Sequence, residues 1–323
     1  MSGPVTREFP PMIDQPKNLP KAIIYRLGAS LLFAMMAVLV RYLGSWIPVG
    51  EMIFFRGFFA MFPLVVFFAL RRELLAALQT KRLGAHFLRG SISIIGSFSY
   101  FGALTRLPVA DTTAISFLTP LITVALAAMF LGEIVHLYRW SAVIAGFLGV
   151  IIMLVPYFDL AHHAALSDEL LTGVVLALLN AVTSAFAVIQ IRRLMTTEKT
   201  TSIVIYFSAF VAIGGLTTLP LGWAMPTTLQ LAALITIGLC GGVAHLLTTT
   251  SYRHADASSL APFDYSSMIW AFLLGYFLFG EVPAVLVVIG AVMIAAAGLV
   301  VVWRERQLGM MRSADEDVVP ARS

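Results

Sequence analysis

Asp264 is a carboxylate inside an almost wholly apolar run, APFDYSSMIWAFLLGYFLFGE at residues 261–281. Placing a carboxylate near the centre of a bilayer costs about 2.5–3.5 kcal/mol, so such a residue needs a partner or a role. His245 lies seven residues before the preceding apolar block ends at Tyr252, and Asp264 lies seven residues after the next begins at Ala257. We predict that the two lie at matching depth, where they could share a proton or a cation. The alternative is that they face different neighbours and that a hydrogen-bonded partner neutralises Asp264.

Arg56 is a second charge inside an apolar block, six residues after that block begins at Gly50. A guanidinium group can hold a carboxylate or a phosphate through two parallel hydrogen bonds, so Arg56 is a candidate for binding an anionic group of a substrate. In the alternative, Arg56 is structural and pairs with Glu51 or with the chain near Asp111. The sequence alone leaves both alternatives open.

Three further polar side chains within apolar blocks are candidates for contact with a substrate. Tyr100 reaches a depth similar to that of Arg56 and either lines an aromatic cavity or packs in the core. Asn180 lies near the middle of its block, where an amide either joins two helices or donates to a substrate. Tyr265 adjoins Asp264. No cofactor and no metal site are predicted, because HExxH, paired midplane aspartates and DxxxD-type acidic pairs are all missing.

The chain that carries these residues is 59% hydrophobic and only 12% charged, with a mean hydropathy of +0.92. A soluble protein carries about 25% charged residues. The apolar residues form long blocks, and a helix of about 20 apolar residues crosses a ~30 Å hydrocarbon layer. The predicted spans are 22–43, 50–70, 86–105, 109–132, 137–156, 170–191, 202–222, 230–252, 257–280 and 283–303. The sequence therefore predicts an all-α integral membrane protein with ten transmembrane helices.

Lysine and arginine fall almost entirely on one side of this arrangement. With the N-terminus inside, all 21 except Arg41, Arg56 and Arg106 lie in inner segments or adjoining helix ends, which leaves 18 inside. Cytoplasmic loops carry such an excess, so we expect both termini in the cytoplasm and the chain in a plasma membrane, the inner membrane of a bacterium. Residues 1–21 and 304–323 are expected to be loose cytoplasmic tails. These loops explain the pI of 9.3, so no nucleic-acid partner is predicted.

A shift of 148 residues aligns the second half of the chain with the first. It puts Glu133, after Gly132, on Glu281, after Gly280. With one residue of slippage Gly149 meets Gly298, and small residues of this kind let helices approach closely. The repeat unit is five spans, an odd number, so the second copy enters the membrane from the opposite side. Such inverted repeats are typical of secondary transporters, whose substrate site lies near the midplane between the repeats.

Three stretches resemble the drug/metabolite transporter superfamily, specifically the ten-helix EamA-type transporters. They are RYLG…GEMIFFRGFFA (41–60), SYFGALTRLPVADTTAISFLTPLITVALAAMFLGE (99–133) and ASSLAPFDYSSMIWAFLLGYFLFGE (257–281). The resemblance implies one EamA repeat at 22–156 and another at 170–303. It also implies a substrate drawn from amino acids, nucleotide-like metabolites, S-adenosylmethionine or riboflavin.

Two prolines and two glutamates are predicted to serve structure or gating. Pro120 lies in the fourth span, where it would allow the helix to bend. Its counterpart is Met268, where the family often has proline, so a break in the ninth span must come from Pro262. Glu133 and Glu281 end the fourth span of each repeat, where their charges can stay hydrated.

Together these features predict a secondary transporter that moves a small polar or amphipathic metabolite, amino-acid-like or nucleotide-like, by alternating access. Coupling to protons is one option. The alternatives are an intramembrane enzyme and a facilitative channel, and the missing catalytic motifs disfavour the enzyme. No GxxxxGK[ST] motif is present, so no ATP site is predicted. The expected partners are a small-molecule substrate and the lipid bilayer, and the sequence is compatible with a homodimer.

Overall fold

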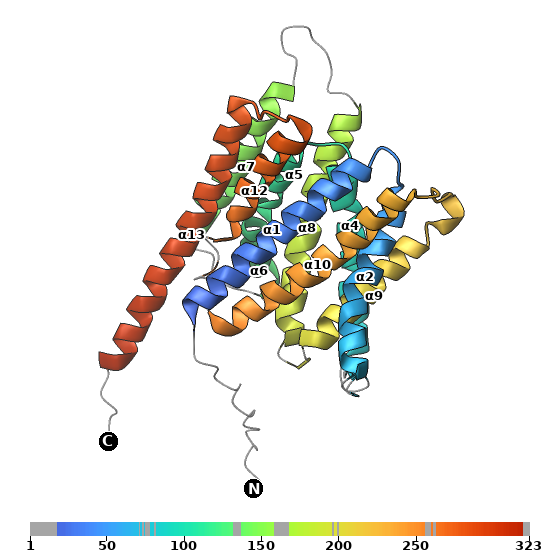
Figure 1. Cartoon of the computed structure of the whole chain (residues 1–323). Coiled ribbons are helices and arrows are strands. Elements are labelled where there is room, and N and C mark those ends of the chain that lie inside the picture. Colours follow the sequence, from blue (N-terminus) through green and yellow to red (C-terminus); the bar gives the residue numbers. More distant parts are fainter. Residues whose placement is uncertain are drawn as a thin grey trace.

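The structure is a computed structural model that describes residues 18–70, 72, 74, 78–80, 82–131, 137–157, 168–195, 197–198, 200–255, 260 and 263–318. Every regular element in these ranges is a helix (Figure 1). A bilayer favours this outcome, because a helix satisfies its backbone hydrogen bonds within the segment and needs no water to do so.

The helices follow the same order in both halves of the chain. The first half forms α1 (Leu19–Leu43), α2 (Val49–Leu70), α4 (Leu83–Leu104), α5 (Val109–Ser116), α6 (Leu118–Leu131), α7 (Leu137–Leu154) and the 3-10 turn η1 (Val155–Tyr157). The second half forms α8 (Asp168–Met195), α9 (Thr200–Leu216), the 3-10 turn η2 (Leu219–Leu221), α10 (Thr228–His254), α12 (Ser266–Phe279) and α13 (Val285–Val318). With α5 and α6 counted as one interrupted span, each half supplies five spans, which confirms the predicted ten-helix fold.

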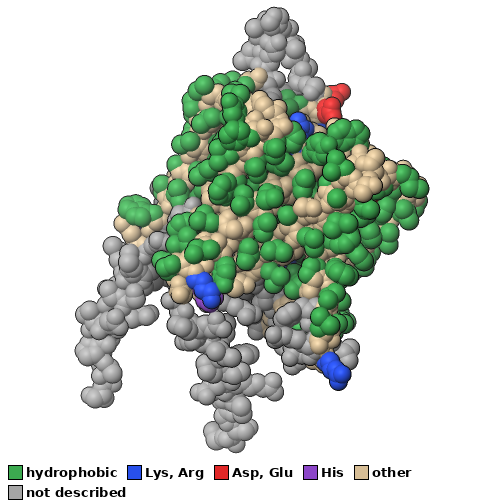
Figure 2. All heavy atoms as spheres, viewed as in Figure 1, with side chains coloured by type: hydrophobic (Ala, Val, Ile, Leu, Met, Phe, Trp, Pro, Cys, Tyr) green, Lys and Arg blue, Asp and Glu red, His purple; other side chains and the backbone are tan. Residues whose placement is uncertain are grey.

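The outer surface of the bundle is suited to lipid. Within the described ranges, α1, α2, α8, α9 and α10 are long and apolar enough to cross a membrane, and shorter apolar helical segments make up further spans. Figure 2 shows one side of the molecule covered by hydrophobic side chains, with charged side chains only near its upper and lower margins. Exposed residues such as Phe277 and Ile24 (75% and 68% accessible) would be unfavourable in water but not in hydrocarbon.

The fourth span is interrupted near Pro120. The sequence predicts one helix over 109–132, but α5 ends at Ser116 and α6 begins at Leu118. A proline lacks the N–H that would bond to the carbonyl four residues earlier and clashes with it, and for Pro120 that carbonyl belongs to Ser116. The break therefore lies where the proline requires it.

The ninth span has a break at the equivalent position. Helical turns at residues 263–264 are followed by a turn at Tyr265, and α12 begins at Ser266. The 148-residue shift puts Phe117, in the first break, on Tyr265 in the second. The two rings lie 4.7 Å apart, centroid to centroid, so the pseudo-twofold relation between the repeats runs close to this pair. Pro262, the predicted cause of the second break, lies outside the described residues.

The last helix is longer than the sequence predicts. The tenth span was expected to end at 303 and a loose tail to begin at 304, but α13 continues to Val318. The added segment, RERQLGMMRSADEDV, is rich in helix formers and contains no proline, so the helix continues beyond its apolar part. Figure 1 shows the start of α1 and the end of α13 at the same end of the bundle.

The packing of the helices follows the repeat. The second helices of the two halves, α2 and α9, pack together, and so do the fifth helices, α7 and α13. The first helix α1 packs against α10 and α12, and its counterpart α8 packs against α4 and α6. A Cβ added at Gly290 of α13 would lie 2.3 Å from the carbonyl oxygen of Gly149 in α7, so these two helices approach closely because both residues lack a side chain.

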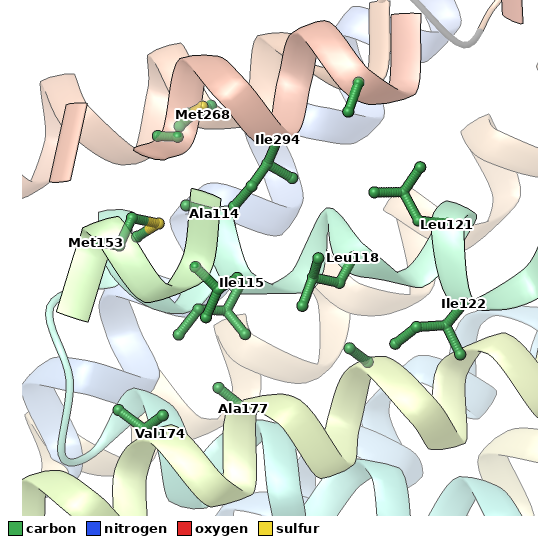
Figure 3. Close-up of a cluster of buried hydrophobic side chains, with 14 of the residues drawn as sticks. Ala114, Ile115, Leu118, Leu121, Ile122, Met153, Val174, Ala177, Met268 and Ile294 are labelled. Atoms are coloured by element: carbon green, nitrogen blue, oxygen red, sulfur yellow. The ribbon is translucent and has the colours of Figure 1, made fainter. Parts of the chain in front are cut away.

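One large apolar core lies where α5, α6, α7, α8, α12 and α13 meet. Figure 3 shows Ile115 and Leu118 between α8, which carries Val174 and Ala177, and the helices that carry Met153, Met268 and Ile294. Leu121, further along α6, points away from α8 and packs against Gly146 of α7. This core fixes the C-terminal part of each repeat around the two helix breaks. A second apolar cluster, between α1, α2, α4, α9 and α10, surrounds the polar residues described next.

Candidate functional site

Arg56 and His245 meet between the two repeats. Arg56 lies two turns into α2 and is only 9% accessible, and its Nη2 lies 3.3 Å from Nε2 of His245, near the middle of α10. An arginine side chain has no acceptor, so Nε2 of His245 accepts this hydrogen bond and carries no proton. A neutral ring then has its proton on Nδ1.

Arg89 of α4 is a second buried cation at this place. It is 7% accessible, and its Nη1 donates to the carbonyl oxygen of Ile203 in α9 at 2.9 Å. The guanidinium carbons of Arg89 and Arg56 lie 5.2 Å and 5.3 Å from the centroid of the Phe207 ring. Both cations therefore rest on one aromatic ring, which attracts them through its quadrupole.

Aromatic rings form the rest of this surrounding. Phe33 of α1 and Phe207 lie 5.1 Å and 5.3 Å from the His245 ring, both in edge contacts. Phe101 lies 6.0 Å from the Arg56 guanidinium, and the Tyr100 hydroxyl is close enough to Arg56 to interact with it electrostatically. Tyr100, Phe207 and His245 stay partly accessible, so space for at least a water molecule remains beside them. We call Arg56, Arg89, Tyr100, Phe207 and His245 the central cluster.

The central cluster is electropositive. The ion pairs between described residues are Arg26–Asp264, Arg41–Glu281 and His86–Glu198, so neither Arg56 nor Arg89 has a carboxylate partner in the described part of the chain. The buried Nε of each guanidinium has no acceptor there either. Within the described residues, these two buried charges are thus compensated by ring faces, one carbonyl, one imidazole and the nearby Tyr100 hydroxyl, and by no carboxylate.

Asp264 lies outside the central cluster. Its carboxylate forms an ion pair with Nε of Arg26 in α1. The predicted pairing of Asp264 with His245 is therefore wrong. The reason is that α1 packs against both α10 and α12 and brings Arg26 to Asp264, while α2 brings Arg56 to His245. The alternative, that a bonded partner neutralises Asp264, describes the structure.

Further polar contacts join α1 to α12 above this ion pair. The hydroxyls of Ser30 and Ser266 lie 2.7 Å apart, and Nε1 of Trp270 donates to Ser30 at 3.2 Å. Tyr265, predicted to contact a substrate, instead has its ring against Phe117 and its hydroxyl beside Gly298 of α13. The structure thus places Tyr265 in the packing between the repeats.

Arg41, near the end of α1, forms an ion pair with Glu281, just after α12. Nε of Arg41 lies 3.6 Å from Glu281, and its Nη1 donates to the carbonyl oxygen of Thr105. Gly280 adopts φ +65°, a left-handed conformation that ends α12 cheaply only for glycine. The Gly-Glu ending therefore stops the helix and places a carboxylate on Arg41. Glu133, its counterpart, lies outside the described residues.

Burial dominates the ionisation of Glu281, which lies in the loop after α12. Its side chain is 20% accessible, and this burial raises the pKa of its carboxyl above the ordinary value of 4.5. The nearby Arg41 acts in the opposite direction and lowers that pKa, but burial has the larger effect.

Asn180 lies on the face of α8 that packs against α4, and it is 8% accessible. Its Oδ1 accepts a hydrogen bond from Ser184, one turn further along the same helix, at 3.3 Å. No hydrogen bond joins it to Arg56, His245 or Tyr100. The structure thus brings together Arg56, His245 and Tyr100 of the predicted site residues, and places Asn180, Asp264 and Tyr265 elsewhere.

Sequence reasoning missed Arg89, Arg26 and Phe207. Both arginines were counted among the charges at the inner helix ends, although each lies a full turn or more inside its helix. That depth was the available signal, because an arginine beyond the first turn can point into the bundle. Nothing in the sequence separates Phe207 from the many other phenylalanines.

An open groove of about 500 Å³ lies between α4 and α8 but does not include the central cluster. Its lining is almost wholly apolar, apart from Ser99 and Arg106. Among the described residues, no group of three or more His, Cys, Asp or Glu side chains could hold a metal ion.

Comparison with known proteins decides the family. The profile of the EamA-like transporter family matches the chain twice, at residues 20–155 and 171–303. The chain belongs to the EamA-like transporter family. Named relatives of this EamA-like transporter move small molecules and are not enzymes, so it is a metabolite transporter of the membrane.

The relatives carry different substrates. An S-adenosylmethionine uptake transporter of Rickettsia bellii is 30% identical over 84% of this chain and 89% of its own length. A pseudopaline exporter, CntI of Pseudomonas aeruginosa, is 27% identical over 86% and 95%, and a riboflavin transporter of Rhizobium johnstonii is 28% identical over 90% and 94%. A solved crystal structure superimposes with a TM-score of 0.62 at 19% identity, over 90% of this chain and 99% of that one, which shows a shared fold.

Proposed function

We propose that this EamA-like transporter moves a small polar or amphipathic metabolite by alternating access, with the central cluster as its substrate site. The observation that carries the proposal is a set of buried polar groups supplied by both repeats. Arg56 and Arg89 come from the first repeat, and His245 and Phe207 come from the second. A site between inverted repeats is exposed to one side and then the other when one repeat rocks against its partner.

The relatives support a class of substrate and not one compound. Their names give S-adenosylmethionine, pseudopaline and riboflavin, and they include both an uptake transporter and an exporter. All three are organic molecules with polar groups. The relatives therefore do not give the direction of transport by this chain, which has to be measured. What the three relatives share is a polar substrate, and such a substrate needs a hydrated path across the membrane.

The contacts between α1 and α12 are the proposed gating elements. Arg26–Asp264 lies toward the end of the bundle where α1 begins, and Arg41–Glu281 lies at the opposite end of α1. The break before Pro120 and the one at Tyr265 divide the two spans beside them. Ion pairs that form and separate, next to interrupted helices, would let the two ends open in turn.

The proposed location is the inner membrane of a bacterium, with both termini in the cytoplasm. The excess of basic residues at one end supports it. Tags fused to each terminus should both resist proteases added to intact cells and should both be cleaved after permeabilisation. Cleavage of one tag in intact cells would overturn this topology.

Reconstitution tests the function directly. Purified protein in liposomes should accumulate at least one of a panel of labelled metabolites, with S-adenosylmethionine and riboflavin included, and the label should be recovered as the unchanged compound. Protein-free liposomes provide the background. Recovery of a converted compound would indicate an enzyme, and no uptake of any compound in either direction would refute the proposal.

Proton coupling is tested separately. Asp264→Asn is expected to insert normally but to lose concentrative uptake, because the charge that pairs with Arg26 is gone. The rate of the wild type is then measured across pH with and without an imposed proton gradient. A rate that depends on neither would indicate uniport.

A further inference from the structure

We propose that the substrate carries a carboxylate or a phosphate, and that Arg56 and Arg89 hold this oxyanion beside Phe207. The inference rests on the proposed function and specifies the class of its substrate. The class is an amphipathic organic anion: a negatively charged group for the two arginines, attached to an apolar or aromatic body.

The first argument is the charge of the central cluster. Arg56 and Arg89 are 9% and 7% accessible, and no carboxylate of the described residues pairs with either. A buried charge without a counter-charge is strongly unfavourable, so proteins normally pair it. His245 does not relieve this, because its Nε2 accepts from Arg56 as a neutral ring nitrogen. A bound anion would supply the missing charge.

The other arginines near α1 provide an internal comparison. Arg26 pairs with Asp264 and Arg41 pairs with Glu281, although both arginines are only partly buried. Within the described residues these two arginines thus have carboxylate partners, and the more deeply buried Arg56 and Arg89 have none. A purely structural role for Arg56 and Arg89 does not explain why the more buried arginines are the ones without a described carboxylate partner.

The second argument is the set of unused donors. Nε of Arg56 and Nε of Arg89 are buried without an acceptor among the described residues. A guanidinium presents N–H groups in a planar fork that matches the two oxygens of a carboxylate or phosphate. Both guanidinium carbons lie within 5.3 Å of the Phe207 ring centroid, so they are at most about 10.5 Å apart, a span that one organic ligand can cover.

The third argument is the aromatic surrounding. Phe33, Phe101 and Phe207 lie around Arg56 and His245. An inorganic anion would gain nothing from these rings, whereas an organic anion can pack its carbon skeleton or its own ring against them. The geometry therefore favours an amphipathic anion over phosphate or sulfate alone.

Binding is tested on the purified wild-type protein with matched pairs of compounds at constant ionic strength. One pair is S-adenosylmethionine and its decarboxylated analogue, which differ in the carboxylate. Another is flavin mononucleotide and riboflavin, which differ in the phosphate. Amino acids with aromatic side chains, each beside its amide, complete the panel. A ligand that binds the folded protein raises its melting temperature.

In at least one pair, the member that carries the carboxylate or phosphate is expected to bind about tenfold or more tightly than the member that lacks it, as charge-assisted hydrogen bonds would give. The carboxylate pairs and the phosphate pair separate the two sources of the oxyanion. Equal responses within every pair, or no response to any member that carries an oxyanion, would overturn the inference. Inorganic phosphate at equal concentration is expected to shift the melting temperature less than the organic anion.

Two variants show whether the arginines are responsible. Arg56→Gln and Arg89→Gln each remove a buried unpaired charge, so the unliganded variants are expected to melt at or above the wild-type temperature while losing about tenfold in affinity for the anion. The matched control is Arg106→Gln, since Arg106 lies at the outer end of α4, bonded to Gly102 and Thr105, away from the cluster. Variants that melt lower and keep the anion response would assign the arginines to structure alone.

This test is independent of the liposome experiment. If the members that carry an oxyanion bind but no compound is transported, the proposed function fails and the anion site stands. If both members of each pair are transported alike, with unchanged KM in Arg56→Gln and Arg89→Gln, the function stands and the anion site fails.

Discussion

The interface between α1 and α12 and the one between α8 and α6 occupy equivalent places in the two repeats but differ in chemistry. The first has an ion pair near each end, Arg26–Asp264 and Arg41–Glu281, with Ser30, Ser266 and Trp270 bonded between them. The second is apolar and lies within the large core, which includes Leu118 and Ile122 of α6 and Val174 and Ala177 of α8 (Figure 3). One repeat fold thus carries two different kinds of contact.

The difference indicates how the two interfaces behave in a membrane. Apolar helix faces gain little by leaving lipid, so the α6–α8 interface depends on close packing, which any loss of volume disturbs. Polar contacts can be exchanged for water or for a ligand, so the α1–α12 interface can separate at lower cost. Substitutions at the α6–α8 interface should change stability, and those at the α1–α12 interface should change transport more than stability.

Leu121→Ala is expected to give the largest loss of stability. Leu121 is 1% accessible and packs against Gly146 of α7, where an added Cβ would lie 2.2 Å from its Cδ1. The cavity left by truncation should lower the unfolding free energy by about 2–5 kcal/mol. Unfolding in mixed micelles measures this, and transport per folded molecule should be unchanged. Leu148→Ala, at a 48% accessible position, is the control and should change stability by much less.

Breaking the Arg26–Asp264 pair should lower the stability less than Leu121→Ala does and should reduce the transport rate more. Arg26→Gln and Asp264→Asn are each expected to lower the unfolding free energy by about 1–2 kcal/mol, between the values for exposed and buried pairs, because the two side chains are 14% and 36% accessible. The double variant should lose less than the sum of the singles, since neither charge is then left unpaired. Strict additivity would show that the pair contributes no coupling.

Much of the fold could be predicted from the sequence because the bilayer restricts the choice. Apolar blocks of span length gave ten helices, and the five-helix repeat gave their inverted relation. The break between α5 and α6 was not predicted, although Pro120 explains it once the helix ends are known. The continuation of α13 to Val318 was missed because its last turns are polar, and hydropathy identifies only the part inside the lipid.

The site was harder to predict, since depth along a helix does not give rotation around it. Counting residues from the helix ends put Arg56 and Tyr100 at similar depth, and these two lie together. It put His245 at the depth of Asp264, counted from the opposite end of the bundle, whereas the structure places His245 against Arg56. It could not tell which helix lies beside which, so His245 was paired with Asp264 instead of Arg56. It also counted Arg89 among the inner-end charges, because a long side chain can turn inward without any sign in the sequence.

Ser30→Ala tests the middle of the polar interface. Its hydroxyl contacts Ser266 and accepts from Trp270, so its removal should lower the unfolding free energy by about 0.5–1.5 kcal/mol and leave the indole N–H unpaired. Thr236→Ala is the matched control, because that exposed hydroxyl bonds only to the carbonyl oxygen of Ala232 in its own helix. If Ser30→Ala and Thr236→Ala lower the unfolding free energy equally, the hydrogen bonds of Ser30 across the α1–α12 interface add no stability of their own.

The smallest expected effect is the dependence of stability on the charge of Glu281. Burial raises the pKa of this carboxyl in the folded protein above its ordinary value of 4.5, so the folded state holds the proton more tightly than the unfolded state does. The resulting stability is fully present below pH 4.5 and is lost as the pH rises through the higher, folded-state pKa. Glu281→Gln removes this dependence because the amide does not titrate.

The measurement is the difference in melting temperature between the wild type and Glu281→Gln, followed from pH 4 upward, with the exposed Glu169→Gln as the control for general charge effects. The melting temperature of the wild type should fall relative to that of Glu281→Gln as the pH rises. The control should show no such trend. If the melting temperature of the wild type instead rises relative to that of Glu281→Gln, the attraction to Arg41 has a larger effect on the pKa of Glu281 than burial has. The α1–α12 interface would then be held by an ion pair at its Arg41–Glu281 end, and opening there would need a ligand or a conformational change that breaks this pair.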